Sequence, residues 1–220
     1  MHPADPFHTR VAQIALAVAD RHGFALGGGL ALIAHGVLER PTEDVDLFSD
    51  VENSVPAATA AVRAALEEAG ITVATVDDDS DLGDIIEDLD GHMAEMTAYR
   101  DDDDNDGVRL SLGHLHRANR PVILDIGPVM HLDDLTAWKV AALVARAEPR
   151  DLVDVNAFLA KRTPEQLLAM ARQVDPGMED EDVAAAGRRL DAMPDWELAN
   201  YGLDETAVAE LRRRFAGWPR

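Results

Sequence analysis

The sequence predicts an α+β fold, in which a mixed sheet with flanking helices is followed by an all-α domain. Segments with the alternation or the β-branched composition of strands occur only before residue 130. From Leu132 onward every segment has the apolar spacing of a helix, and prolines separate these segments. We therefore expect an α/β domain over residues 1–130 and a helical domain over residues 131–220.

The elements of the first domain follow from local patterns. Apolar residues at a 3.6-residue spacing predict a helix over 7–22, which Gly23 ends. A short apolar stretch at 24–26 leads into a triple glycine, where a helix over 30–36 is expected to begin. The other elements expected in this domain are a helix at 56–69 and strands at 44–48, 71–76, 108–112 and 122–126.

The second domain is expected to be built from helices alone. Proline or a Pro-Gly pair interrupts the apolar spacing several times, as expected at helix ends. The expected helices lie at 133–147, 149–161, 164–174, 179–191 and 204–216.

Acidic residues are concentrated in one segment. The formal net charge is −22, and residues 77–106 hold 14 acids against the single base Arg100, which gives −13 for the segment. Asp-rich sequence favours a loop, although residues 82–89 could form a turn or two of helix. The stretch from Asp102 to Gly107 is similar to the start of a calcium loop, but position 12 is Gly113 instead of the closing Glu. We therefore expect a solvated acidic loop.

Composition excludes several classes of protein. The chain has no cysteine, which excludes disulfide scaffolds, thiol catalysis and Cys-ligated metal sites. It has no apolar run near 18 residues, which argues against a membrane span, and its start lacks the pattern of a secretory signal. We expect a cytoplasmic protein without a membrane partner.

A glycine turn and a pair of aspartates form the strongest candidate site. Asp44 and Asp46 are spaced i, i+2 in a predicted strand, so both project from one face, roughly 7 Å apart at the Cα atoms. Converging carboxylates favour a hard divalent cation. Gly28 and Gly29 precede a helix, where exposed N–H groups suit phosphate. The combination suits phosphoryl or nucleotidyl transfer. The alternative is that the two acids are only the polar face of an edge strand.

A third carboxylate strengthens the metal interpretation. Asp125 lies in Val122-Ile-Leu-Asp-Ile126, an otherwise apolar run that predicts a strand. A buried carboxylate is costly unless a cation or hydrogen-bond donors lie nearby. We expect Asp44, Asp46 and Asp125 on adjacent strands, where they would form a site for two metal ions.

These residues resemble the nucleotidyltransferase superfamily, which has the DNA polymerase β-like fold, and within it the AbiEii/AbiGii toxin family. The resemblance covers about residues 20–162. The matching segments are Gly28-Gly29-Leu-Ala-Leu-Ile-Ala-His-Gly36, Arg40-Pro-Thr-Glu-Asp44-Val-Asp46-Leu-Phe48, Leu124-Asp125-Ile126, and Leu132-Asp-Asp-Leu-Thr-Ala-Trp-Lys139 through Arg150-Asp151-Leu-Val-Asp154.

The resemblance implies a role for each matching residue. It implies that Asp44, Asp46 and Asp125 bind magnesium and that Gly28 and Gly29 bind the triphosphate of an NTP. The remaining implied residues are Lys139, which contacts the nucleotide phosphates, and Asp151, an acid essential to transfer. Spacing alone also allows Asp151 to pair structurally with Arg146 or Arg150.

The same resemblance implies a magnesium-dependent nucleotidyltransferase that releases pyrophosphate. We expect its active site in a cleft between the two predicted domains. The resemblance also implies a toxin with a cognate antitoxin and an RNA acceptor such as tRNA. We then expect Arg146, Arg150, Arg162 and Arg172 to contact the RNA. A small-molecule transferase of the antibiotic-modifying type and a catalytically silent binding scaffold remain alternatives, and the low basic charge favours the small-molecule acceptor.

One departure from the family pattern concerns the glycines. Members of the family that this sequence resembles usually carry Ser or Thr directly after, or in place of, the second glycine, and its hydroxyl contacts a phosphate. This chain has Gly29 followed by Leu30. Phosphate contact at this motif would therefore rest on backbone groups.

Overall fold

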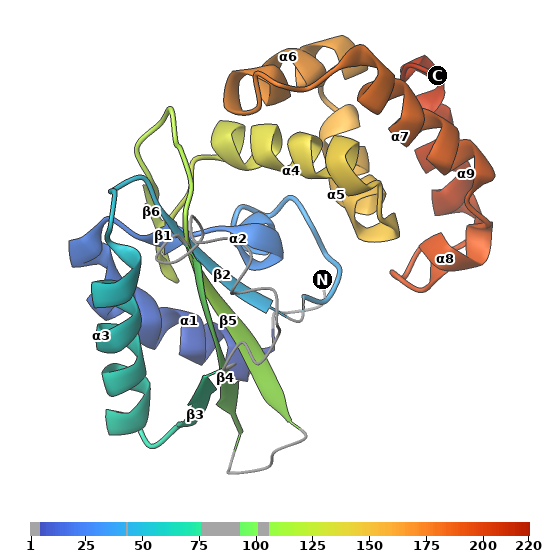
Figure 1. Cartoon of the computed structure of the whole chain (residues 1–220). Helices are drawn as coiled ribbons and strands as arrows, with labels where there is room; N and C mark the ends of the chain where they lie inside the picture. The colour runs from blue at the N-terminus through green and yellow to red at the C-terminus, as the bar shows by residue number, and fades with distance from the viewer. Residues whose placement is uncertain (1–4, 43, 76–92, 101–105) are drawn as a thin grey trace, which may run out of the picture. The chain divides into compact units, whose positions relative to one another are not determined.

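The computed structural model describes residues 5–42, 44–75, 93–100 and 106–220 of the 220-residue chain. The chain divides into two compact units, Met1–His131 (the first unit) and Leu132–Arg220 (the second unit). A mixed sheet with flanking helices in the first unit, followed by helices in the second, confirms the predicted fold class (Figure 1). Most of the expected acidic loop, including residues 82–89, for which a helical turn was the alternative, and the aspartates at 101–104, lies outside the described residues.

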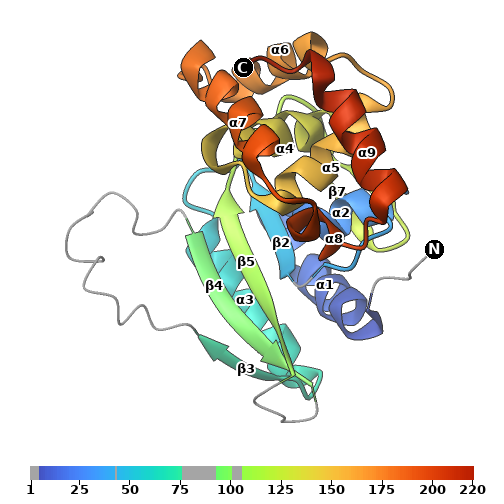
Figure 2. The same cartoon turned by 90° about the vertical axis from the view of Figure 1, so that its right-hand side faces the viewer.

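The described strands of the first unit form one seven-stranded mixed sheet of order β3-β4-β5-β2-β1-β7-β6. The strands are β1 (Ala25–Leu26), β2 (Asp44–Ser49), β3 (Thr72–Thr75), β4 (Met93–Tyr99), β5 (Gly107–His114), β6 (Val122–Leu124) and β7 (Gly127–Val129). At the centre of the sheet, β2 runs antiparallel to β1 and parallel to β5. β4 extends this region because it pairs antiparallel with β5, and Figure 2 shows these strands side by side.

Two long helices cover one face of the sheet. α1 (Pro6–Ala19) and α3 (Val55–Glu68) pack against each other, and Figure 2 shows α3 behind the strands. Each helix buries one apolar stripe, as its 3.6-residue pattern predicts. Alternate side chains of the strands point towards these helices. Val45 and Leu47 of β2 and Leu110 of β5 are therefore completely buried. The opposite face of β2 therefore carries Asp44, Asp46 and Phe48.

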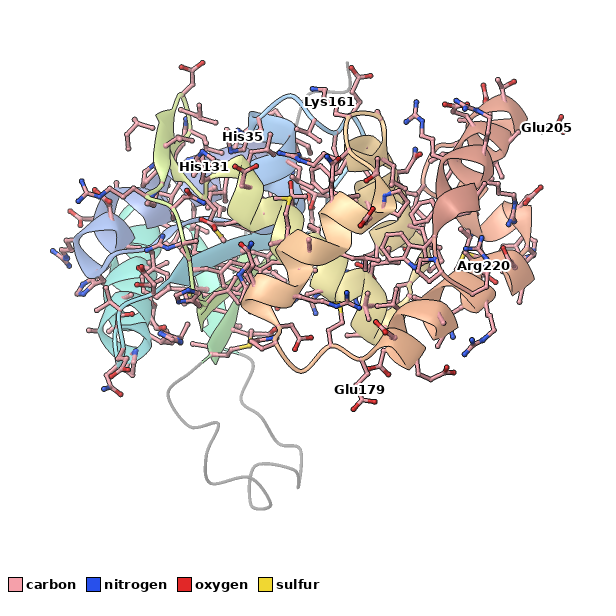
Figure 3. All side chains as sticks on the ribbon, turned by 90° about the horizontal axis from the view of Figure 1, so that it is seen from above. His35, His131, Lys161, Glu179, Glu205 and Arg220 are labelled. Atoms are coloured by element: carbon pink, nitrogen blue, oxygen red, sulfur yellow. The ribbon has the colours of Figure 1, made fainter. Side chains whose placement is uncertain are left out.

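A third, short helix connects the two central strands. α2 (Gly28–Ala34) follows β1 directly and packs on β2. His35 lies at the end of α2 and is labelled in Figure 3. Its ring nitrogen Nε2 is 2.9 Å from the carbonyl oxygen of Met130, just after β7. This hydrogen bond joins the end of α2 to the β7 side of the sheet.

Two features of the first unit differ from the sequence prediction. β4 lies within the acidic segment that we expected to be a loop. Its short alternation, with Met96 and Ala98 buried, is hidden by the aspartates on either side. The apolar run 122–126 is not one strand, because the chain turns after Leu124 and returns as β7. Gly127, with φ of +125°, adopts a backbone conformation there that other residues avoid.

The second unit is helical, and α4 is its central helix, because it packs against α5, α6 and α7. The helices are α4 (Leu132–Arg146), α5 (Pro149–Leu159), α6 (Pro164–Val174), α7 (Asp180–Ala192), α8 (Asp195–Ala199) and α9 (Glu205–Arg214). α8 was not predicted, since five residues are too few for a periodic pattern. No helix among the described residues is long and apolar enough to cross a bilayer.

Side-chain contacts fix the C-terminal end of this unit. The indole N–H of Trp218 donates to the carbonyl of Val183 on α7 at 3.0 Å. Beyond it lies Arg220, which is labelled in Figure 3. Its guanidinium pairs with Asp191 at 2.6 Å. The last residues are therefore held against α7 by one buried and one surface contact.

Candidate active site

The two predicted metal ligands lie on the same face of β2. Asp44 and Asp46 are half-buried, while Val45 and Leu47 between and after them point into the core. Neighbouring same-face positions on a strand are roughly 7 Å apart at the Cα atoms. The strand itself is as predicted, and the alternation explains why the two carboxylates share a face.

The neighbouring strand β5 places a cation beside Asp44. In the parallel register Arg109 lies opposite Asp44, and its Nη2 and Nε atoms lie 3.0 Å and 3.1 Å from the same oxygen, Asp44 Oδ1. The hydrogen bond and charge of Asp44 raise the pKa of Arg109, and the carboxylates of Glu95 and Asp46 add to this effect. Because both contacts engage Oδ1, the guanidinium leaves the Oδ2 side of this carboxylate to other partners.

A third acid occupies the same face two strands away from β2. Ser111 of β5 lies opposite Asp46, and Glu95 of β4 lies opposite Ser111. The Ser111 hydroxyl is 3.5 Å from Glu95 Oε1. This face of β2, β5 and β4 is thus acidic, with Arg109 among the carboxylates.

The glycine turn lies directly against Asp46. The N–H of Gly27 donates to the carbonyl oxygen of Asp46 at 2.7 Å. Gly28 has φ of +60°, and a Cβ atom there would lie only 1.7 Å from Asp46 Oδ2. Any larger residue at position 28 would collide with the carboxylate and strain the backbone. The structure therefore brings together the glycines and the aspartate pair that the sequence grouped.

Asp125 does not join this site. It lies exposed in the turn between β6 and β7, at the edge of the sheet. β7 and β1 separate β6 from β2, which corresponds to about 14 Å at the usual strand spacing. The expectation that Asp44, Asp46 and Asp125 lie on adjacent strands is wrong. The acid Asp125 interrupts the apolar run because it lies in a hairpin turn, where its charge is exposed to solvent.

Lys139 has a buried partner in the second unit. Its Nζ atom lies 2.8 Å from Oδ2 of Asp154, and the Asp154 side chain is fully buried while that of Lys139 is 16% exposed. The lysine therefore presents one constrained ammonium group near the surface of α4. The sequence had singled out Lys139, but nothing in the spacing had shown that Asp154 is its partner.

Asp151 takes part in a structural network within the same unit. Its two carboxylate oxygens each accept a 2.8 Å hydrogen bond from Arg146, which raises the pKa of Arg146. One of them also accepts from the backbone N–H of Glu148 at 3.3 Å, which completes the capping box at the start of α5. The pairing of Asp151 with Arg146, which spacing left open, is present.

Oxygen ligands of this kind suit magnesium. Within the described residues no three His, Cys, Asp or Glu side chains are grouped as a metal site. Magnesium usually takes only one or two carboxylates and completes its shell with water and substrate phosphates. Asp44 and Asp46, half-buried on one face beside the glycine turn, fit that requirement.

The mixed sheet with its flanking helices is similar to the fold of known proteins, among them a nucleotidyltransferase. Among solved structures, JHP933 from Helicobacter pylori is similar with a TM-score of 0.57 and 15% identity, covering 96% of this chain and 91% of that chain. MenT4, a nucleotidyltransferase toxin from Mycobacterium tuberculosis, is similar with a TM-score of 0.60 and 18% identity, covering 96% of this chain and 82% of that chain. At these identities the likeness shows the fold.

Residues 12–214 match the family described as nucleotidyl transferase AbiEii toxin, Type IV TA system. The chain belongs to this family, and it is a nucleotidyltransferase of the toxin–antitoxin type. Such an enzyme acts on a nucleotide substrate with a divalent metal, and its family implies an antitoxin partner. A search of curated proteins gave no match.

Proposed function

We propose that this protein uses magnesium to transfer a nucleotide from an NTP to an acceptor hydroxyl, with release of pyrophosphate. The observation that supports it best is the placement of Asp44 and Asp46 on one face of β2, with the turn at Gly28 against Asp46. A phosphate cradle beside a metal-binding carboxylate pair is the arrangement that such transfer needs.

Five residues of the first unit have roles in this proposal. Asp44 and Asp46 hold magnesium, which when bound neutralises charge on the phosphates. Backbone N–H groups of Gly28 and Gly29 bind the triphosphate. Arg109 fixes the orientation of Asp44 through Oδ1, as partners of metal-binding carboxylates generally do.

The second unit contributes positive charge. We assign to Lys139 the contact with the phosphates, where an ammonium group stabilises charge on the leaving pyrophosphate. Its ion pair with Asp154 limits where that group lies. Asp151 supports transfer indirectly, because it fixes the first turn of α5, the helix that also carries Asp154.

Family membership supports an RNA acceptor such as a tRNA, but one observation favours a small molecule. The four arginines expected to contact RNA are each paired with an acid of the second unit. The pairs are Arg146 with Asp151, Arg150 with Glu148, Arg162 with Asp133 and Arg172 with Asp180. Locally neutralised arginines release fewer counterions on binding a nucleic acid. We therefore keep the antibiotic-type small-molecule acceptor as the second candidate.

Label transfer at increasing salt distinguishes the two acceptors. The protein is incubated with magnesium, each α-labelled NTP in turn and bulk cellular RNA, and γ-labelled NTP serves as the control for phosphoryl transfer. An RNA acceptor predicts label in the RNA from the α position only, with acceptor affinity falling about 0.7 to 0.9 log units per log unit of salt for each phosphate contacted. The small-molecule candidate predicts no labelled RNA at any salt concentration.

A further inference from the structure

The space that a side chain at position 29 would fill is already occupied by a hydroxyl. A Cβ atom placed on Gly29 would lie 2.8 Å from Thr42 Oγ1 and 3.3 Å from Thr42 Cβ. The glycine turn of this chain has no hydroxyl of its own, since Gly29 is followed by Leu30. Thr42, which lies thirteen positions later and two residues before β2, brings a hydroxyl to the same location.

The hydroxyl of Thr42 retains hydrogen-bonding capacity. Thr42 is half-buried, and its Oγ1 atom is 3.5 Å from the carbonyl oxygen of Asp44. A contact of that length is at the outer limit of a hydrogen bond. A hydroxyl has one donor and two acceptor positions, so it can turn its donor to an anionic oxygen without losing a strong bond.

Arg40 adds a cation beside the same glycine. Its Nη2 atom lies 3.7 Å from the position of a Cβ on Gly29, while Nη1 donates to the carbonyl of Pro41 at 2.9 Å. A guanidinium is planar and offers several N–H donors, which suits phosphate oxygens. Positive charge is needed at this point, because Asp44 and Asp46 on β2 would otherwise repel a polyphosphate.

We propose that Thr42 and Arg40 bind the polyphosphate of the NTP, with Thr42 supplying the hydroxyl that the glycine motif lacks and Arg40 the neighbouring positive charge. The inference rests on the proposed function in one respect, namely that the nucleotide binds at Gly28 and Gly29. It predicts that removal of either side chain weakens nucleotide binding more than it slows the bound enzyme.

Moving the hydroxyl between the two positions tests the role of Thr42. Equilibrium binding of a non-hydrolysable NTP analogue with magnesium is measured by calorimetry, alongside KM and kcat. Thr42→Ala should weaken binding about ten- to hundredfold, as expected for a lost hydrogen bond to a charged group, with kcat changed less. Thr42→Ser should bind like wild type. Gly29→Ser alone should bind weakly, because its Cβ collides with Thr42 Oγ1.

The double variant Gly29→Ser/Thr42→Ala is the decisive member of the set. The serine hydroxyl then occupies the volume that Thr42 has left, and binding should return to within about threefold of wild type. Thr59→Ala on α3, whose hydroxyl donates to Val55 within the helix, is the matched control and should change nothing. Thermal melts confirm that each variant is folded.

Arg40 is tested by Arg40→Gln, with Arg63→Gln on α3 as its control. We expect weaker binding and a shallower salt dependence for Arg40→Gln only. Two results would overturn the inference and leave the proposed function standing, provided that the wild-type chain binds the analogue. One is a Thr42→Ala chain that binds the analogue as well as wild type does. The other is a double variant that binds it no better than Thr42→Ala. A wild-type chain that binds no NTP with magnesium would overturn both the inference and the proposed function.

Discussion

Variants of the ion pair between Lys139 and Asp154 can distinguish a role of Lys139 in the stability of the second unit from its proposed role in nucleotide transfer. Lys139→Met keeps the length of the side chain and removes the ammonium group that lies 2.8 Å from Asp154 Oδ2. Because the Asp154 side chain is fully buried, its carboxylate then loses this cation without gaining water. A buried charge in that position is strongly destabilising.

The expected loss is about 3 kcal/mol of unfolding free energy. Removing one partner of a buried pair usually costs about 3 to 5 kcal/mol. The lower end applies here for two reasons. Lys139 is partly exposed, and Arg146 retains a favourable electrostatic interaction with Asp154. Substituting both residues with apolar ones, as in Lys139→Met/Asp154→Leu, should recover at least half of the loss.

Urea denaturation followed by circular dichroism measures these differences, and label transfer measures the chemistry. The control is Lys161→Met, since Lys161 is the other lysine of the chain and is exposed (Figure 3). We expect Lys139→Met to be unstable and inactive, and the double variant to be more stable but still inactive. A Lys139→Met chain as stable as Lys161→Met would refute the argument from burial, and an active double variant would refute the phosphate contact.

Two further predictions concern the second unit. Asp151→Ala should lower the unfolding free energy by about 2 kcal/mol, because α5 loses one half of its capping box and Arg146 loses its bidentate partner. The folded variant should bind NTP within threefold of wild type, whereas a fully stable but inactive variant would show a direct role in the chemistry. The hydrogen bonds of Arg213 and Arg214 lower the pKa of Glu210 from 4.5 to about 2. Because the pKa of Glu210 is lowered in the folded state, its ionised carboxylate stabilises the folded protein above pH 4.5. This stabilisation disappears as the pH falls towards 2. Melts of wild type and Glu210→Gln should therefore differ at neutral pH and converge near pH 2, and a difference that is constant with pH would contradict this assignment.

Local patterns were sufficient to predict most of the fold. The helices have clear 3.6-residue spacing and proline boundaries, as at Pro149 and Pro164, and β2 alternates strictly. β4 was missed because a seven-residue strand lies among aspartates that dominate the composition. The β6–β7 hairpin was missed because its turn is only Asp125-Ile126, within a run of apolar residues.

The candidate site was predictable where its residues are close in sequence. Asp44 and Asp46 share a face through strand alternation alone, and Gly28 precedes them by a short connection. Contacts between residues that are distant in sequence could not be predicted from local patterns, because strand register and helix packing determine which residues meet. Arg109 reaches Asp44 only through the pairing of β2 with β5, and Asp154 reaches Lys139 only through the packing of α5 on α4.

The most direct test of the central claim compares two isosteric aspartate variants. Pyrophosphate release and α-label transfer are measured in a magnesium titration for wild type, Asp46→Asn and Asp125→Asn. Loss of a carboxylate that holds the metal should abolish magnesium-dependent activity in Asp46→Asn, whereas Asp125→Asn, altered in an exposed turn at the sheet edge, should retain the wild-type titration curve. Wild-type transfer by Asp46→Asn, or loss of magnesium dependence in Asp125→Asn alone, would contradict the assignment of the active site to β2.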